Sequence, residues 1–308
     1  MLKGAFGRID AMLAQRAQET AAAANPRQRE IDDMAREGAM LGPVPEQGFL
    51  AVKMLLAQKR VDDALRVAAQ LDLSRVMNVG SRRFHDFTDR ENLVYAEARH
   101  VAIATPQAVV SLVRAVDYIL KNDIPGAFIE CGVYQGGSII AMIRTLLLNG
   151  VTDRDVYLFD TFEGMPRPGE QDVYYTGEAA VSTWKYHSGR DSGSEWVNAS
   201  LESVKERVLA TGYPPERIHF VKGMVEDTIP AQAPDKIALL RLDTDFYEST
   251  KHEFEHLFPR LSRGGVLVID DYGAFRGSQI ATDEYIARHR IALFLSRVDE
   301  HVRLAIKL

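Results

Sequence analysis

Short apolar runs alternate with amphipathic segments from residue 105 to the C-terminus. The runs are almost continuously apolar, which is typical of strands covered on both faces in a parallel sheet. The segments between them carry apolar residues at helical spacing. We therefore predict an α/β fold with strands at 127–131, 156–160, 217–221, 237–242 and 265–269, helices within 105–122 and at about 137–149, 199–211, 250–261 and 278–289, and a closing antiparallel hairpin within 291–308.

The first hundred residues lack this alternation. Strong helix formers followed by a loop occupy residues 1 to about 45, and one or two amphipathic helices are predicted within 48–71. The polar stretch 82–92 is interpreted as a loop. We divide the chain into a helical N-terminal extension, 1–104, and an α/β domain, 105–308.

Composition is that of an ordinary globular protein, because 46% of the 308 residues are hydrophobic and 26% are charged. The net charge of −6 argues against a general binder of nucleic acid or of anionic membranes. No apolar run approaches the roughly 18 residues that a membrane span needs, and charges interrupt the N-terminal segment, so we expect no secretory signal. With Cys131 as the single cysteine, no intrachain disulfide can form, and we predict a cytoplasmic protein.

Acidic or glycine-rich segments follow three successive strands. The first strand ends at Glu130, a glycine-rich turn follows, and a helix opens near Ser138. Asp160 ends the second strand, where an acid can hold ribose hydroxyls, and Glu226 follows the third, where it can accept from an adenine amino group. The turn spacing G-x-x-x-G-G differs from the G-x-G-x-x-G of dinucleotide binders, so the pattern favours S-adenosylmethionine over NAD. The plainer interpretations are a tight turn without ligand, a solvated or capping acid, and a helix-start acid.

Two further strands end in carboxylates. Asp243 and Asp245 follow the fourth strand, and Asp270 and Asp271 follow the fifth. Neighbouring strand ends meet at one edge of a parallel sheet, so these groups repel one another unless a cation or protons compensate. Oxygen ligands suit a hard divalent cation, with Mg²⁺ the first choice and Mn²⁺ or Ca²⁺ as alternatives. We predict that Asp243, Asp270 and Asp271 bind the metal; the alternative is a set of helix caps, for which Asp245 is a candidate.

A polar, glycine-rich stretch at 163–198 carries Trp184, Tyr186 and Trp196. Loops of this length in a compact domain are commonly functional, so we predict a lid over the site. His187 lies in the same stretch, and we interpret it as a surface residue, with contact to substrate as the alternative.

The sequence HEFEH at 252–256 matches the zinc-protease motif H-E-x-x-H in form. On a helix that packs against a parallel sheet, we interpret its charges as solvated. Cys131 is interpreted as a small buried apolar side chain.

Residues from about 84 to 290 resemble the macrocin O-methyltransferase (TylF-type) family. The likeness is carried by IATPQAVVSLVRAVDYILKNDIPGAFIECGVYQGGS, YLFDTFEGMP, TGYPPERIHFVKGMVEDTIP, LLRLDTDFYESTKHEFEHLFPRLSRGGVLVIDDYG and FRGSQIATDEYI, in this order. Members of the family are S-adenosylmethionine- and Mg²⁺-dependent enzymes that methylate sugar hydroxyls of antibiotics. The resemblance implies a class I methyltransferase fold, which is a Rossmann-like, mostly parallel seven-stranded sheet with an antiparallel last strand.

Methyl transfer to a hydroxyl requires a base. Asp243, which would touch both metal and hydroxyl, and Asp245, which need not share its charge with the ion, are both candidates for the base that takes the proton of the acceptor hydroxyl. The resemblance implies the other roles. The N-terminal part of family members helps to cover the substrate site and can join subunits, so 1–104 is expected to be a substrate cap and the chain to form a homo-oligomer. Metal ligation falls at Asp243, Asp270 and Asp271, and cofactor contacts fall at Glu130, Gly132, Ser138, Asp160 and Glu226.

The leading prediction is a metal-dependent O-methyltransferase whose acceptor is a sugar hydroxyl of a glycosylated natural product, a glycan or another polyol, with no nucleic-acid or membrane partner. Aromatic lid walls would instead favour a catechol-like phenol or another vicinal diol. A noncatalytic scaffold would be expected to have lost an acid at 243, 270 or 271, and all three are present. An NAD-dependent dehydrogenase is disfavoured by the glycine spacing.

Overall fold

The computed structural model describes residues 86–188 and 194–308, and some residues between 51 and 67. The chain forms two compact units, Met1–Arg83 and Phe84–Leu308. In the first unit the described residues at 51–52, 54–55, 63–64 and 66–67 are helical, as predicted within 48–71. The predictions for residues 1–45 lie outside the described residues.

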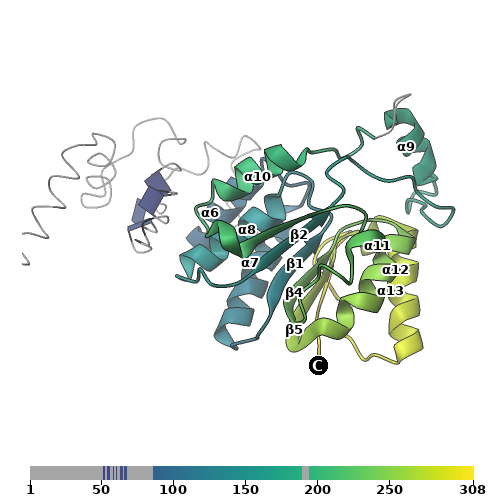
Figure 1. Cartoon of the computed structure of the whole chain (residues 1–308). Coiled ribbons are helices and arrows are strands. Elements are labelled where there is room, and N and C mark those ends of the chain that lie inside the picture. The colour runs from purple at the N-terminus through teal and green to yellow at the C-terminus, as the bar shows by residue number, and fades with distance from the viewer. Residues whose placement is uncertain are drawn as a thin grey trace, which may run out of the picture. The chain divides into compact units, whose positions relative to one another are not determined.

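A seven-stranded sheet forms the centre of the second unit, with the order β3-β2-β1-β4-β5-β7-β6 (Figure 1). The first five strands are parallel, and β7 runs antiparallel to β5, which confirms the predicted sheet with its antiparallel last strand. The strands are β1 (Ala127–Cys131), β2 (Val156–Asp160), β3 (Ile218–Lys222), β4 (Ile237–Leu242), β5 (Leu261–Ile269), β6 (Ser296–Arg297) and β7 (Arg303–Ile306).

Helices cover both faces of this sheet (Figure 1). One layer contains α6 (Asp89–Ala98), α7 (Pro106–Lys121), α8 (Gly137–Leu148) and α10 (Leu201–Leu209), and the other contains α11 (Val225–Thr228), α12 (Tyr247–His256) and α13 (Arg276–His289). A further helix, α9 (Ala180–His187), stands apart from the sheet. Three short 3₁₀ turns complete the elements: Pro215–Arg217, Phe258–Arg260 and Asp271–Gly273.

Alternate residues of each central strand enter two separate hydrophobic cores. Phe128 and Leu239 belong to the core under α7 and α8, whereas Ile129 and Leu240 belong to the core under α12 and α13. Successive strand residues point to opposite faces, so a strand between two helical layers is apolar at nearly every position, with Glu130 and Arg241 as buried charged exceptions. This requirement explains the continuous apolar runs in the sequence.

Three segments differ from the sequence prediction. The stretch 82–92, predicted as a loop, contains the start of α6, because Thr88 caps that helix. The helix predicted to reach residue 261 ends at His256, and the short turn that contains Pro259 leads into β5 at Leu261. The predicted lid is not wholly a loop, since it contains α9.

The division at residue 104 remains a prediction. Within the second unit, α6 and α7 pack on each other and both contact α8. None of the described helices is long and apolar enough to cross a membrane.

The start of α6 gives the first test. The Thr88 hydroxyl accepts a hydrogen bond from the Glu91 N–H, and the Glu91 carboxylate accepts one from the Thr88 N–H. We expect Thr88→Ala to lower the free energy of unfolding by about 1 kcal/mol in urea titrations, because one backbone donor loses its partner. Thr88→Ser keeps the hydroxyl and should stay near wild type; equal losses in both variants would contradict the capping role.

Candidate active site and metal centre

One pocket opens at the carboxyl ends of β1, β2, β4 and β5. Ligands of open α/β sheets bind at this edge, where the strand order reverses between β1 and β4. The pocket brings together every residue for which the sequence predicts a role in cofactor binding, metal binding or catalysis: Glu130, Gly132, Ser138, Asp160, Glu226, Asp243, Asp245, Asp270 and Asp271.

The glycine turn after β1 lies directly against the loop after β4. Gly132 has φ +82°, and a side-chain carbon at this position would lie 1.9 Å from the carbonyl oxygen of Asp243. The Asp243 N–H in turn donates to the Cys131 carbonyl over 2.9 Å. Both the backbone conformation and the close approach therefore require glycine at 132.

Asp160 holds the same turn in place from β2. One of its carboxylate oxygens accepts from the N–H groups of Val133, at 2.6 Å, and Tyr134, at 3.1 Å, and the other accepts from Phe162 at 2.7 Å. Asp160 is thus a backbone cap for the turn, which was the plainer of the two interpretations. The predicted contact with a ribose remains a prediction, and carboxylate oxygens have the lone pairs to accept further bonds.

Two other predicted cofactor residues carry carboxylate oxygens without a protein donor. Glu130 is 1% exposed, and its Oε2 atom has no hydrogen-bond partner. The Oε2 atom of Glu226 in α11 is also buried and has no hydrogen-bond partner. Burial raises the pKa of Glu130 to about 7, against the opposing effect of the nearby Arg241. Buried acceptors of this kind are normally satisfied, so donors from a bound ligand would fit here.

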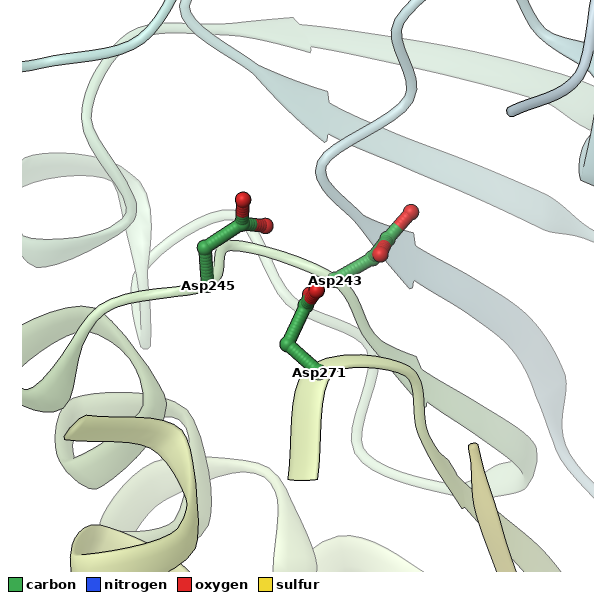
Figure 2. Close-up of side chains that lie close together, drawn as sticks. All are labelled: Asp243, Asp245 and Asp271. Atoms are coloured by element: carbon green, nitrogen blue, oxygen red, sulfur yellow. The ribbon is translucent and has the colours of Figure 1, made fainter. Parts of the chain in front are cut away.

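Three carboxylates gather beside the turn (Figure 2). Asp243 and Asp245 come from the loop after β4 and Asp271 from the turn after β5, and one oxygen of each lies within 4.8 Å of the others. A set of oxygen ligands suits a hard divalent cation, so these three carboxylates fit the Mg²⁺ or Mn²⁺ ion that the sequence predicts.

Asp270 lies in the same pocket but differs from its neighbours. Its Oδ1 accepts from Arg241 Nη2 at 2.6 Å, and the cluster found among the described residues contains Asp245 in its place. The assignment of Asp270 as a metal ligand therefore remains a prediction, and Asp245 is a structurally placed alternative.

Asp245 does not act as the cap of α12. The residue before that helix is Phe246, and the N–H of Tyr247 donates to Asp172 over 2.8 Å. Asp245 instead has φ +67°, an uncommon conformation for a residue other than glycine. This backbone conformation goes with the placement of its carboxylate beside Asp243 and Asp271.

Crowding changes the protonation of this cluster. Burial, and then repulsion from the other carboxylates, raises the pKa of Asp271 well above the ordinary range, and the pKa of Asp243 is raised in the same way despite the attraction of Arg241. Burial raises the pKa of Asp245 to about 8, with the charges of Asp243 and Asp270 acting in the same direction.

Two important residues were not identified in the sequence. Arg241 is 3% exposed within β4 and contacts three acids. The sequence signal that could have identified Arg241 is a single charged residue inside the otherwise apolar strand IALLRL. Glu253 is 0% exposed and accepts from the Thr244 hydroxyl at 3.0 Å, so the interpretation of the HEFEH charges as solvated was wrong at this position. Burial raises its pKa well above the ordinary value, and its face of α12 points into the core.

The lid segment presents few of its aromatic residues to the pocket. Trp196 packs against Tyr174, Phe246 and Phe275, whereas Tyr186 is 85% exposed on α9. In the part of the segment that the structure describes, the residues lining the pocket are Gly164, Met165, Pro166 and Val197. Cys131 is buried in the core, as predicted, but its thiol also forms a side-chain hydrogen bond with Glu253.

The glycine turn gives the second test. Gly132→Ala should weaken S-adenosylhomocysteine binding about tenfold or more in calorimetry, because the new methyl group displaces the turn from the Asp243 loop. Gly150→Ala is the matched control, since Gly150 has φ +72° but no atom within 4 Å of the added carbon. The control should cost only about 1–2 kcal/mol of stability, from backbone strain. Equal binding by both variants would contradict the close-approach argument.

The protonation of Asp245 gives the third test. A carboxyl group whose pKa is about 8 when folded stabilises the protein at low pH, and this stabilisation is lost as the pH rises toward 8. In buffer containing EDTA, the free energy of unfolding should therefore fall between pH 5.5 and 7.5, with Asp245 accounting for about 2–3 kcal/mol. Asp245→Asn should flatten this decline in urea titrations. A decline of unchanged slope would show that Asp245 titrates normally.

Comparisons with known proteins show the family of this chain. The sequence profile of the macrocin-O-methyltransferase (TylF) family matches residues 56–304. The chain is 35% identical over 184 residues to the 8-demethyl-8-(2,3-dimethoxy-alpha-L-rhamnosyl)-tetracenomycin-C 4'-O-methyltransferase of Streptomyces olivaceus, a match that covers 60% of this chain and 67% of that one. It is 33% identical over 186 residues to the demethyldecarbamoylnovobiocin O-methyltransferase of Streptomyces niveus, covering 60% and 68%.

Solved structures extend the likeness to the fold. The O-methyltransferase NovP superimposes with a TM-score of 0.62 at 26% identity, covering 86% of this chain and 99% of that chain. The calicheamicin methyltransferase CalS11 superimposes with a TM-score of 0.52 at 19% identity, covering 87% and 95%, which supports the fold alone. Because the family profile spans most of the 308 residues, the chain belongs to the macrocin-O-methyltransferase (TylF) family and is an O-methyltransferase that uses S-adenosylmethionine.

Proposed function

We propose that this enzyme methylates a sugar hydroxyl of a glycosylated small molecule and that the reaction depends on a divalent cation, Mg²⁺ or Mn²⁺. The observation that carries the proposal is the cluster of Asp243, Asp245 and Asp271 in the same pocket as the glycine turn. The sugar acceptor is supported by a relative that is named for a rhamnosyl-tetracenomycin. Another relative, 31% identical to this chain over 189 residues, is named a mycinamicin III 3''-O-methyltransferase.

The cofactor would lie across the glycine turn. Its ammonium group can donate to the free oxygen of Glu130, and its adenine amino group to that of Glu226. Gly132 and Ser138 line the pocket between the turn and the opening of α8, where the helix adds partial positive charge for the cofactor's carboxylate. Asp160 orders the turn and is proposed to hold the ribose.

In the transfer, the acceptor oxygen forms a bond to the methyl carbon as the bond between that carbon and the sulfonium sulfur breaks. S-adenosylhomocysteine leaves, and the hydroxyl proton passes to a carboxylate. A bound divalent cation would supply charge that lowers the pKa of the hydroxyl and orients it. The chain's own contribution is to hold both reactants in line at the edge of a rigid sheet.

Asp245 and Asp243 are the candidates for the base. A base has to lie within reach of the hydroxyl and be free to take its proton. Asp243 already accepts a hydrogen bond from Arg241, whereas Asp245 comes from the same loop without an ion pair to that arginine. We therefore favour Asp245 as the base and Asp243 as a metal ligand, together with Asp271 and with Asp270 as the further candidate.

The alternatives have lost part of their support. A catechol-like acceptor was favoured by aromatic lid walls, but Trp184, Tyr186 and Trp196 are not among the described residues that line the pocket. A noncatalytic scaffold does not need the acid cluster. The homo-oligomer, the cytoplasmic location and the substrate-cap role of the N-terminal extension remain predictions.

Four asparagine variants test the assignment of the acids. In buffer containing EDTA, Asp243→Asn and Asp245→Asn should each bind S-adenosylhomocysteine within about threefold of wild type in calorimetry, because neither residue is proposed to touch the cofactor. Asp243→Asn should lose Mg²⁺ affinity, whereas Asp245→Asn should keep it and lose about 10²–10⁴ in kcat as a base would. Asp270→Asn shows whether Asp270 or Asp245 completes the ligand set. Asp235→Asn, at an exposed residue before the other end of β4, is the control and should behave as wild type.

The acceptor assay uses rhamnosylated and other glycosylated aromatic compounds beside catechols. If only glycosides are methylated, the proposal is supported. If only catechols are methylated, the vicinal-diol alternative replaces it. A wild-type protein that binds S-adenosylhomocysteine but shows unchanged turnover in EDTA would overturn the metal dependence. Loss of Mg²⁺ affinity in Asp245→Asn would make Asp245 a ligand and leave Asp243 as the base.

A further inference from the structure

Arg241 connects the two halves of the active site. Its guanidinium is buried within β4, where its Nη1 donates both to Glu130 Oε1 on β1 and to Asp243 Oδ2 in the following loop. Its Nη2 donates to Asp270 Oδ1 at 2.6 Å. One side chain thus contacts a carboxylate at the cofactor end of the pocket and two carboxylates at the metal end.

The contact pattern is specific to arginine. A guanidinium is planar and always charged, and its donors point in fixed directions, so one group can hold carboxylates from separate strands in defined positions. A lysine at this position would keep the charge but could not reproduce the fork. The arrangement therefore fixes geometry as well as charge.

Glu130 and Asp243 share the single positive charge of Arg241. Nη1 carries two N–H groups, so Glu130 Oε1 and Asp243 Oδ2 can each accept one, and Asp270 faces the same guanidinium. A cation bound to the acid cluster would offset part of the negative charge of Asp243 and Asp270, so the attraction of Arg241 would then act mainly on Glu130. Glu130 Oε2, which lies buried without a partner in the wall of the cofactor pocket, is then held more firmly toward the cofactor.

We infer that Arg241 is a positioning residue that couples the metal site to the cofactor site, so that occupation of the acid cluster strengthens cofactor binding although Arg241 touches neither ligand. The inference rests on the proposed function, because it requires both sites to exist. Beyond that function, the binding free energies of the two sites are coupled. By linkage, the factor by which Mg²⁺ changes cofactor affinity equals the factor by which the cofactor changes Mg²⁺ affinity.

The test is isothermal titration of the full chain with S-adenosylhomocysteine, in EDTA and in saturating MgCl₂. S-adenosylhomocysteine carries no sulfonium charge, so direct repulsion between sulfonium and metal does not mask the coupling. For wild type we expect Mg²⁺ to tighten binding about fivefold or more, the lower end of ordinary coupling between sites. In Arg241→Lys the ratio of the two dissociation constants should fall to about one, with weaker binding in both buffers.

Arg144→Lys is the matched control. Arg144 is likewise fully buried, and it donates to both oxygens of Glu97, at 2.7 and 2.8 Å, away from the pocket. Loss of the paired Arg144–Glu97 hydrogen bonds should lower the Tm. The ratio of the S-adenosylhomocysteine dissociation constants in EDTA and in MgCl₂ should stay at its wild-type value. A purely structural role of Arg241 would therefore resemble the control, with a lower Tm and an unchanged ratio, and this result would overturn the inference.

A second variant is available if Arg241→Lys does not fold. Glu130→Gln keeps an oxygen that can accept from Nη1, but replaces the free acceptor by an amide N–H₂ group. The affinity ratio should then fall toward one while the Mg²⁺ affinity measured without cofactor stays within about twofold. A wild-type ratio in this variant, or a ratio of one in the wild type itself, overturns the coupling. A wild-type protein that does not bind S-adenosylhomocysteine at all would instead overturn the proposed function, and the coupling with it.

Discussion

The concentration of negative charge at one edge of the sheet is the constraint on which the rest of the site depends. A single guanidinium, that of Arg241, lies among carboxylates that the low-dielectric surroundings cannot keep ionised without compensation. Protons taken up at raised pKa values are one compensation, and a divalent cation is another. The acids concerned are Glu130, Asp243, Asp245, Asp270 and Asp271.

This charge is held in place by backbone contacts. The Asp243 N–H donates to the Cys131 carbonyl, and the Asp270 N–H donates to the Leu242 carbonyl, both over 2.9 Å. The loops after β1, β4 and β5 are therefore continuations of the sheet ladder, and Gly132 allows the first to lie against the second. Carboxylates mounted on such a frame have their spacing set by the backbone, and fixed positions of this kind are what an in-line methyl transfer requires.

The lid segment shares the same support. Asp172 accepts from the N–H of Gly169 within the segment and from the N–H of Tyr247 at the start of α12, and its own carbonyl accepts from Ala180. Tyr174 forms a bridge with Phe275, just before α13. The base of this segment is thereby fixed to the helices that follow the two acid loops, so the segment and the acid cluster are held by the same elements.

The sequence by itself determined the strands, their parallel order and the positions of the acids at their ends. These features are local, because apolar runs, helical spacing and strand-end carboxylates can be recognised within a few neighbouring residues. Strands β1, β2 and β4 have the predicted bounds, and the nine predicted site residues line one pocket.

Only the tertiary structure decided how those residues pair. Arg241 meets Glu130 across 111 positions of sequence, and the same guanidinium also contacts Asp270, whereas Asp245 joins the cluster with Asp243 and Asp271. The burial of Glu253 and the use of Asp160 as a backbone cap are likewise set by packing between distant elements. A sequence pattern shows that a carboxylate stands at a strand end, but its partner depends on which side chains the fold brings within hydrogen-bond distance, and that is a property of the folded sheet.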